Sequence, residues 1–252
     1  MTLTGTAATE ARRSALQTML AEDGRVDLAT AALNFRVHSM TIRRDLEVLE
    51  SEGVARRVRG GAIYVGIDDH RQRQLRNLNA KRRIAEKLVP LVGANDAIGM
   101  DASTTILQLA ARLPDVGRLS VVTNGLATFQ ALQGRPGIRS YLTGGEAEEE
   151  NAALVGPFAL ATLESFLLTS CFISASCVDP VLGLSDSTIG EVEVKRAMAE
   201  SAQRVVVAAD STKLGNRAVA RGLPLNAVHL LVTDLDPADT RLDPFRELVD
   251  LL

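Results

Sequence analysis

The stretch HSMTIRRDLEVLESEGVARRVRGG, residues 38–61, combines a short amphipathic pattern with a basic segment that ends in two glycines. At 3.6 residues per turn, Ile42, Leu46 and Leu49 fall on one stripe of a helix, which leaves the arginine pair 43–44 on the other side. The spacing therefore predicts a helix with one packed face and one exposed basic face, followed by a basic hairpin.

A helix of this kind suits the major groove of DNA, where the first turns of a recognition helix lie against base edges and phosphates. An arginine pair on a helix is more often simply solvated, so the pair alone decides little. Three further arginines follow within four residues, as expected for a wing that grips the DNA backbone. The predicted DNA-binding residues are Ser39, Thr41, Arg43, Arg44, Arg56, Arg57 and Arg59.

These residues resemble the DeoR family of bacterial transcriptional regulators, whose N-terminal domain carries a TIRRDL helix followed by a glycine, a basic turn and a Gly-Gly-Ala. The matching segments are residues 41–46, 53, 56–59 and 60–62. One position departs from the family pattern. A serine usually follows the valine that enters the helix, whereas here His38 follows Val37 and Ser39 comes next. A cap at Ser39 would start the helix one residue later.

The 252 residues, 46% of them apolar and 23% charged, give enough length for two domains of ordinary globular composition. No apolar run approaches the roughly 20 residues of a membrane span, and the N-terminus lacks the apolar core of a signal peptide. We therefore expect a cytoplasmic protein with no membrane partner. Cys171 and Cys177 have apolar, strand-like surroundings and the three histidines are scattered, so we expect two buried thiols and no metal site.

The charges are divided unevenly along the chain. Residues 1–83 contain 15 Lys and Arg against 10 Asp and Glu, whereas residues 84–252 contain 13 against 21, and the whole chain has a net charge of −3. Binding to phosphates depends on local basic surface rather than on total charge. The distribution favours a DNA-binding N-terminal domain attached to an acidic body.

Two further helices are predicted before the recognition helix, over residues 9–22 and 28–34. Together with the recognition helix and the hairpin they predict a winged helix-turn-helix domain over residues 1–66. Residues 67–80 have few apolar positions and mixed charges. They predict a linker, and an extra surface helix of the second domain is the alternative.

From residue 81 onward, short apolar segments alternate with helical patterns. The expected strands span residues 97–100, 119–123, 139–143, 170–174, 204–208 and 228–233, and the expected helices span residues 81–92, 106–113, 125–133, 157–166 and 190–201. This alternation favours a mainly parallel sheet covered on both faces by helices. We therefore expect a Rossmann-like α/β domain over residues 81–252.

The sequence Asp101-Ala102-Ser103-Thr104-Thr105 follows the first of these strands and opens a helix. Backbone N–H groups at such a turn point at one place, the helix dipole adds positive potential there, and hydroxyls can donate as well, so the turn can hold a phosphate. A hydroxyl that merely caps the helix is the alternative, and the local sequence by itself favours it.

The C-terminal half resembles the effector domain of the same family, a relative of the ribose-5-phosphate isomerase and CoA-transferase folds, in which a loop of this type binds the phosphate of a sugar phosphate. The resemblance extends to residues 123–125, 144–145, 191–195 and 210–213. The family usually has glycine where this chain has Ser103. The effector-binding residues that the resemblance implies are Asp101, Ser103, Thr104, Thr105, Thr123, Asn124, Gly144, Gly145, Lys195, Asp210 and Lys213.

Together these resemblances imply a repressor of a carbohydrate-metabolism operon, without a cofactor and without enzyme activity. It would bind double-stranded operator DNA as a homo-oligomer, a dimer or tetramer, and a sugar phosphate would control its DNA affinity. The alternative is a sugar-phosphate isomerase-like enzyme whose N-terminal helices serve oligomerisation. Candidate acid and base groups are Asp179, Glu191, Glu193, Asp210 and Lys213. Nothing in their spacing singles out a base, and a packing module would not need five arginines on a shared exposed side.

Overall fold

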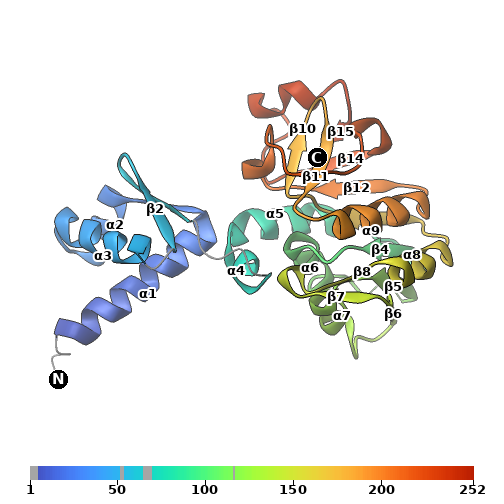
Figure 1. Cartoon of the computed structure of the whole chain (residues 1–252), viewed down its shortest axis with the longest axis horizontal. Coiled ribbons are helices and arrows are strands. Elements are labelled where there is room, and N and C mark those ends of the chain that lie inside the picture. Colours follow the sequence, from blue (N-terminus) through green and yellow to red (C-terminus); the bar gives the residue numbers. More distant parts are fainter. Residues whose placement is uncertain (1–4, 52–53, 65–69, 116) are drawn as a thin grey trace. The chain divides into compact units, whose positions relative to one another are not determined.

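The structure is a computed structural model that describes residues 5–51, 54–64, 70–115 and 117–252. The chain forms two compact units, divided between Asn79 and Ala80, and Figure 1 labels most of their elements. The end of the predicted first domain, residues 65–66, and the predicted linker residues 67–69 lie outside the described residues. The rest of the predicted linker contains helix α4 (His70–Leu75) and the start of α5 (Leu78–Leu88).

The first unit is a winged helix-turn-helix. Its helices are α1 (Gly5–Asp23), α2 (Leu28–Phe35) and α3 (Ser39–Ser51), and its strands are β1 (Arg25–Asp27), β2 (Ala55–Val58) and β3 (Gly61–Tyr64). The strands pair antiparallel in the order β1-β3-β2. The sequence predicted the three helices and the β2–β3 hairpin but not β1, because three residues are too few to show an alternating pattern.

The core of the first unit consists of the helix faces that the 3.6-residue spacing predicts. Leu16 and Leu20 of α1 and Ile42, Leu46 and Leu49 of α3 are at most 2% exposed and belong to one hydrophobic cluster. Burial of one such side chain contributes roughly 1.5–3 kcal/mol. These five side chains therefore account for much of the cohesion between the first and third helices.

The turn between α2 and α3 is set by local hydrogen bonds. Asp27 caps the start of α2, because its carboxylate accepts from the N–H of Thr30 at 2.9 Å. Arg36 ends α2 in the left-handed conformation, with φ of 51°, and its N–H bonds back to carbonyls in the last turn of the helix. Only residues 37 and 38 then remain before α3 begins, which makes the connection as short as a helix-turn-helix requires.

The second unit is built around a seven-stranded parallel sheet with the order β15-β14-β12-β9-β4-β5-β6. The strands are β4 (Ala97–Met100), β5 (Leu119–Thr123), β6 (Ile138–Leu142), β9 (Ser170–Ile173), β12 (Val205–Ala208), β14 (Leu230–Val232) and β15 (Asp250–Leu251). The helices are α5, α6 (Thr104–Ala110), α7 (Leu126–Leu132), α8 (Pro157–Glu164) and α9 (Ile189–Glu200). The predicted Rossmann-like α/β fold with a parallel sheet is confirmed.

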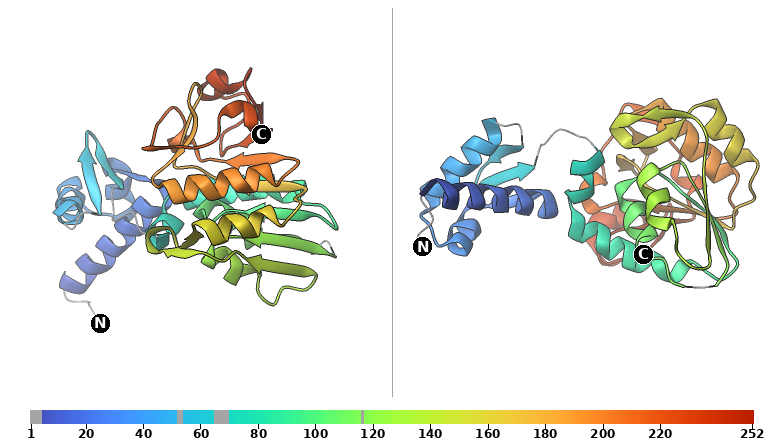
Figure 2. Two further views of the ribbon diagram at one scale, coloured as in Figure 1. Left: turned by 45° about the vertical axis from the view of Figure 1, so that its right-hand side comes forward. Right: turned by 90° about the horizontal axis from the view of Figure 1, so that it is seen from below.

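Helices cover both faces of this sheet, as Figure 2 shows. Along β12, Val205 and Val207 join the hydrophobic cluster under α8 and α9, whereas Val206 and Ala208 join the cluster under α5 and α6. Successive side chains of a strand point to opposite faces, so a strand buried on both sides is apolar throughout. The central strand β12 therefore carries no polar side chain within its bounds.

Several short strands lie outside the main sheet. β10 (Cys177–Asp179), β11 (Gly183–Asp186) and β13 (Ala220–Arg221) form an antiparallel sheet, and β7 (Glu146–Glu148) pairs with β8 (Ala153–Val155). The sequence did not predict them, because segments of two to four residues carry too little periodicity. Helix α6 begins at Thr104, two residues before its predicted start. Within the described ranges, no helix is long and apolar enough to cross a membrane.

Candidate DNA interface and effector site

Helix α3 turns its basic side chains outward. Its apolar stripe is buried, whereas Arg43 and Arg44 are exposed and Ser39 and Thr41 are half-buried. The two arginines lie within the first two turns of the second helix of the helix-turn-helix. In helix-turn-helix proteins that is the part of the recognition helix that reaches base edges in the major groove.

The start of α3 is capped by an imidazole. Nδ1 of His38 accepts a hydrogen bond from the N–H of Met40 at 3.2 Å, and the carbonyl of His38 accepts from the N–H of Thr41 at 2.8 Å. His38 therefore occupies the position that a side-chain cap takes before the first helical residue. The expectation that Ser39 caps a later start is wrong, because Ser39 is already the first residue of the helix.

The aspartate of the TIRRDL segment has a structural partner that the sequence did not reveal. Asp45 is buried, and its carboxylate accepts from Nε of Arg12 at 2.6 Å and from Nε of Arg13 at 3.0 Å. A buried carboxylate needs such partners, because burial of an unpaired charge is costly. Arg12 and Arg13 therefore tie α1 to the recognition helix.

The wing arginine Arg57 points toward α3. Its Nε lies 2.6 Å from the carboxylate of Glu50, its Nη1 lies 2.6 Å from that of Glu47, and its backbone N–H donates to Glu50 at 2.8 Å. The backbone and side-chain hydrogen bonds from Arg57 lower the pKa of Glu50. Arg57 therefore links the hairpin to the helix while its side chain remains exposed.

The other two wing arginines are also exposed. Arg56 points to the face of β2 opposite Arg57, because successive side chains of a strand alternate. Arg59 and Gly60 form the two-residue turn, where Gly60 has φ of 90°, a conformation that favours glycine. A cavity of about 260 Å³ lies between α3 and the hairpin, with Arg43 and Arg57 in its wall.

In the second unit, polar side chains follow four neighbouring strands at their carboxyl ends. Asp101 follows β4, Asn124 follows β5, Ser174 follows β9 and Asp210 follows β12, and all four are at most 2% exposed. The strand order places these ends side by side, and Oδ2 of Asp101 accepts from the N–H of Ser174 at 2.8 Å. We call this polar region at the carboxyl ends of the strands the candidate effector site, since ligands of open α/β sheets bind at such ends.

Ser103 closes the loop after β4 as a helix cap. Its N–H and Oγ donate to Oδ1 of Asp101 at 3.1 and 2.6 Å, and Oγ accepts from the N–H of Ile106 at 3.2 Å. The hydroxyl of Ser103 therefore caps α6, which was the alternative to phosphate binding. Thr104 and Thr105 are buried in the first turn of α6, whereas Ser103 is half-buried, so Ser103 is the one of the three that reaches the surface.

Lys195 enters the site from α9. It is buried, and its Nζ lies 2.8 Å from Oδ1 of Asp186 and 3.8 Å from Oδ2 of Asp101. Burial by itself would lower the pKa of Lys195, but the charges of Asp186, Glu191 and Asp101 outweigh it and raise that pKa. Burial raises the pKa values of Glu191 and Asp101. Asp186 was missed because β11, which carries it, has no recognisable pattern.

Lys213 and Asp210 lie on the other side of Ser174. Nζ of Lys213 donates to Oγ of Ser174 at 3.1 Å, and the carboxylate of Asp210 accepts from the N–H of Thr212 at 3.2 Å. Burial would raise the pKa of Asp210, but Lys213 and the hydroxyl of Thr212 outweigh it, so the pKa is lowered. Lys213 is half-buried and supplies a cation at this end of the site.

Two of the implied effector residues, Gly145 and Thr123, have structural reasons for their identity. Gly144 and Gly145 are exposed after β6, and Gly145 has φ of 129°. A Cβ on Gly145 would lie 2.3 Å from the carbonyl oxygen of Val155, which excludes any other residue there. Oγ1 of Thr123 accepts from the N–H of Gly125 at 3.0 Å and so shapes the turn after β5.

Several buried polar atoms near the carboxyl ends have no hydrogen-bond partner among the described residues. They are Oγ1 of Thr105, Oδ1 of Asn124, Oγ1 of Thr128, Oγ1 of Thr143 and Oδ2 of Asp186. Buried polar atoms are normally paired, because an unmet hydrogen bond costs free energy. The site therefore has hydrogen-bonding capacity that the chain itself does not use.

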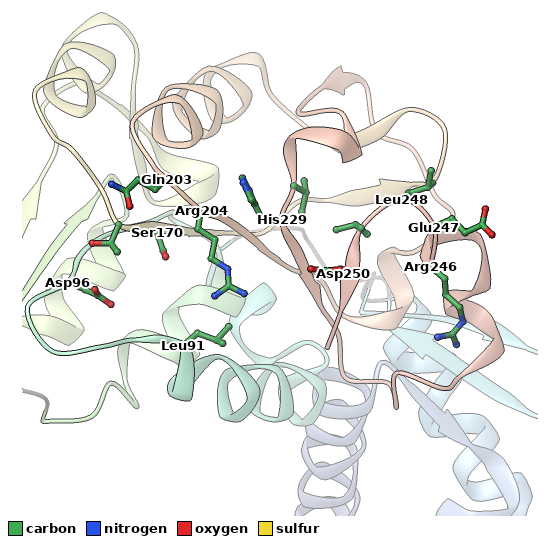
Figure 3. A pocket seen from close by; sticks show the side chains of 13 residues that line it. Leu91, Asp96, Ser170, Gln203, Arg204, His229, Arg246, Glu247, Leu248 and Asp250 are labelled. Atoms are coloured by element: carbon green, nitrogen blue, oxygen red, sulfur yellow. The ribbon is translucent and has the colours of Figure 1, made fainter.

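A larger cavity, of about 900 Å³, opens at the opposite side of the main sheet, where the strands begin (Figure 3). Its wall includes Asp96, Arg204 and His229, which precede β4, β12 and β14. None of the implied effector residues lines it. Its charged side chains are of both signs and mostly exposed, so volume alone does not make it the effector site.

Cys171 is buried, which raises the pKa of its thiol to about 12, whereas Cys177 is only partly buried. The prediction of two buried thiols is therefore correct for the first cysteine and only partly so for the second. Within the residues that the structure describes, no group of three His, Cys, Asp or Glu side chains could hold a metal ion.

Solved structures share parts of this architecture at low sequence identity. Ribose 5 phosphate isomerase A from Neisseria gonorrhoeae is 21% identical, with a TM-score of 0.37, over 53% of this chain and 52% of that one. The tetrameric eIF2B-beta2-delta2 complex from C. thermophilum is 15% identical, with a TM-score of 0.49, over 96% and 88%.

Comparison with protein families assigns both units. The model of the DeoR-like helix-turn-helix domain matches residues 12–67, and that of the DeoR C terminal sensor domain matches residues 76–235. The HTH-type transcriptional regulator YulB of Bacillus subtilis is 35% identical over 82% of each chain. The transcriptional repressor GlcR of the same organism is 31% identical over 90% of this chain and 89% of its own. The L-fucose operon activator of Haemophilus influenzae is 28% identical over 92% and 94%. The chain therefore belongs to the DeoR family of transcriptional regulators.

Proposed function

We propose that this regulator is a repressor of a carbohydrate-metabolism operon and that a phosphorylated sugar controls its affinity for operator DNA. Residues 1–66 would bind the DNA, residues 67–80 would connect the domains, and residues 81–252 would bind the sugar phosphate and form the oligomer. The protein would act on transcription and not as an enzyme, in keeping with relatives that are named as regulators.

The observation that carries the DNA-binding role is the orientation of α3. Its apolar stripe is fixed in the core, so Arg43 and Arg44 project from the first turns of the recognition helix. Arginine in that position can donate two hydrogen bonds to a guanine edge. Arg56 and Arg59 of the hairpin are exposed and would add contacts to the phosphate backbone, which position the protein without reading sequence.

The sensor role is supported by the candidate effector site of the second unit. The matched sensor-domain segment, residues 76–235, contains every implied effector residue. Lys213, which is half-buried at this end of the site, would meet the phosphate, and the buried carboxylates, with Ser103 bound to Asp101, would lie beside the sugar. The name of one relative, the L-fucose operon activator, suggests a carbohydrate operon, and names such as that of the repressor GlcR suggest repression.

A ligand alters DNA affinity only if it binds the two conformations of the regulator unequally, and a typical coupling free energy is about 1–3 kcal/mol. In a homo-oligomer, two DNA-binding domains would dock on half-sites separated by whole turns of the DNA helix. The effector would shift the oligomer between arrangements that fit this spacing and arrangements that do not.

The test is DNA binding by fluorescence anisotropy, with the DNA upstream of the protein's own gene. Arg43→Ala and Arg44→Ala should each weaken binding to that DNA and reduce the preference over unrelated DNA, since each lost base contact is worth about 1–3 kcal/mol. Arg139→Ala, which removes an exposed arginine from β6 of the second unit, is the control and should bind as the unchanged protein does. Equal binding by all three variants would refute the assignment of α3.

A further inference from the structure

Charged side chains lie on both sides of Ser174 in the candidate effector site, Lys213 with Asp210 on one side and Lys195 with several carboxylates on the other. On one side Lys213 donates to Oγ of Ser174 at 3.1 Å. On the other side the N–H of Ser174 donates to Asp101 at 2.8 Å, and Asp101 lies 3.8 Å from Lys195. Lys213 is half-buried whereas Lys195 is buried, so the phosphate of a ligand would be attracted to the end with Lys213.

The end around Lys195 contains more negative charge than its single ammonium group can neutralise. Asp186 binds Lys195 at 2.8 Å, and Asp101 lies within 3.8 Å. Glu191 precedes Lys195 by four residues on α9, which places both on the same face of the helix. Glu148 contributes a further negative charge near Glu191. We call Asp101, Asp186 and Glu191 the carboxylate cluster.

The hydrogen-bond pattern shows which carboxylates are still available. Both oxygens of Asp101 are occupied, one by Ser103 and one by Ser174. Oδ1 of Asp186 accepts from Lys195 and from the N–H of Ser176 at 2.8 Å, whereas Oδ2 is buried and has no partner within the described ranges. Asp186 itself is 2% exposed. Oδ2 of Asp186 is therefore a buried acceptor that a donor group of a ligand could satisfy.

A donor-rich ligand suits this end better than an acidic one. Hydroxyl and amino groups can donate to a buried carboxylate, and hydrogen bonds with a charged partner are the strong ones. A carboxylate on the ligand would bring a like charge against three others, two of them buried, and repulsion between buried charges is weakly screened. A metal ion is not the expected occupant, since among the described residues no group of three ligating side chains could hold one.

We propose that Asp186 and Glu191 determine effector specificity by binding the hydroxyl or amino groups of a neutral or amino sugar phosphate and by excluding the phosphates of sugar acids. This inference rests on the proposed function, because it concerns the same effector site. Asp186 supplies the unused buried acceptor, and Glu191, which is half-buried, supplies a second and more exposed carboxylate.

The test compares matched ligands on the full-length protein by thermal shift and by titration calorimetry. Each pair shares its carbon number and phosphate position: glucose 6-phosphate and glucosamine 6-phosphate against 6-phosphogluconate, ribose 5-phosphate against 5-phosphoribonate, and erythrose 4-phosphate against 4-phosphoerythronate. Inorganic phosphate is included as a reference. We expect a neutral or amino member to raise the Tm, and its acid partner to bind at least about tenfold more weakly.

Variants test whether the named carboxylates cause this preference. Asp186→Asn and Glu191→Gln should each weaken the binding of the preferred ligand by about tenfold. Each should also reduce the ratio of its affinity to that of the acid partner. Glu193→Gln removes an exposed carboxylate from the same helix and should leave both affinities unchanged. The ratio of the two affinities is the readout, because a merely structural role would lower both alike. If Asp186→Asn fails to fold, the ratio can still be compared between Glu191→Gln, a change at a half-buried position, and the unchanged protein.

The outcomes separate this inference from the proposed function. An acid phosphate that binds the unchanged protein as tightly as its neutral partner, or more tightly, would overturn the role of the carboxylate cluster and leave the sensor function standing. A ratio that neither Asp186→Asn nor Glu191→Gln alters would also overturn it. If every sugar phosphate fails to shift the Tm beyond inorganic phosphate, the proposed sensor function itself is overturned.

Discussion

Nε of Arg12 lies 2.6 Å from Oδ2 of the buried Asp45, and this ion pair joins the first helix of the DNA-binding unit to the recognition helix. Asp45→Ala would leave Arg12 and Arg13 without their shared carboxylate. We expect a loss of about 2–4 kcal/mol in the free energy of unfolding, near the lower part of the range for a buried pair because both arginines keep some contact with water.

Urea denaturation followed by circular dichroism measures this loss. Glu10→Ala, which removes an exposed carboxylate from α1, is the control and should change the free energy of unfolding by less than about 0.5 kcal/mol. An Asp45→Ala protein as stable as this control would show that the pair does not hold the two helices together.

The two kinds of wing arginine should differ in DNA binding. Arg56→Ala and Arg59→Ala remove exposed cations, so each should reduce the slope of log affinity against log salt by about one unit without changing sequence preference. Arg57 is held by Glu47 and Glu50, so its loss should act mainly through the position of the hairpin.

The acidic partners of Arg57 provide the check on that distinction. Simultaneous Glu47→Gln and Glu50→Gln should lower DNA affinity as Arg57→Ala does, because either change releases the hairpin from α3. If the double variant instead binds more tightly with a steeper salt dependence, Arg57 contacts phosphate directly once it is free.

Replacement of His38 by serine should preserve the cap of α3, whereas replacement by alanine should remove it. His38→Ser restores a hydroxyl acceptor at the same position, whereas His38→Ala leaves the N–H of Met40 without its side-chain partner. We expect His38→Ala to cost about 0.5–2 kcal/mol in the free energy of unfolding and His38→Ser to cost little. Equal losses in the two variants, measured by urea denaturation, would contradict the capping role.

The sequence was informative where the structure follows local periodicity. The spacing of Ile42, Leu46 and Leu49 fixes which side of α3 is exposed, and each apolar run long enough to show a pattern became a strand or helix near its predicted bounds. The strand β1 and the small strands beside the main sheet were missed, because two to four residues carry too little pattern.

The sequence was uninformative where partners are distant along the chain. Asp45 lies 32 and 33 residues from its two arginines, and no local pattern indicates such a pairing. The same holds for Asp186, which lies on an unpredicted strand and meets Lys195 only after α9 has folded back on the sheet. From the sequence, Ser103 could be either a helix cap or an effector-binding residue, and only its hydrogen bonds show that it caps α6.

Glu191 should make the unliganded protein less stable at neutral pH. Burial raises its pKa in the folded state above the ordinary value of 4.5. The folded protein therefore binds more protons than the unfolded chain between these two pKa values, so this group's contribution to stability falls as pH rises through that window. The contributions of Asp210 and Asp239 to stability instead rise with pH, since the pKa values of both groups are lowered in the folded state.

Glu191→Gln isolates this contribution. The variant should unfold at a higher temperature than the unchanged protein at pH 7, and the difference should shrink as the pH is lowered toward 4.5, because the carboxylate then becomes protonated. Glu193→Gln again serves as the exposed control. A difference in Tm that is constant between pH 7 and pH 4.5 would show that the ionisation of Glu191 is not the cause.

The most direct test of the account is the affinity of the full-length protein for the DNA upstream of its gene, measured by anisotropy with and without a saturating sugar phosphate identified by thermal shift. We predict a change of about 5- to 150-fold in DNA affinity, and the same factor in sugar-phosphate affinity when the DNA is present, because coupling between two sites is reciprocal. A DNA affinity that stays the same under saturating sugar phosphate would contradict the claim that the second unit controls the first.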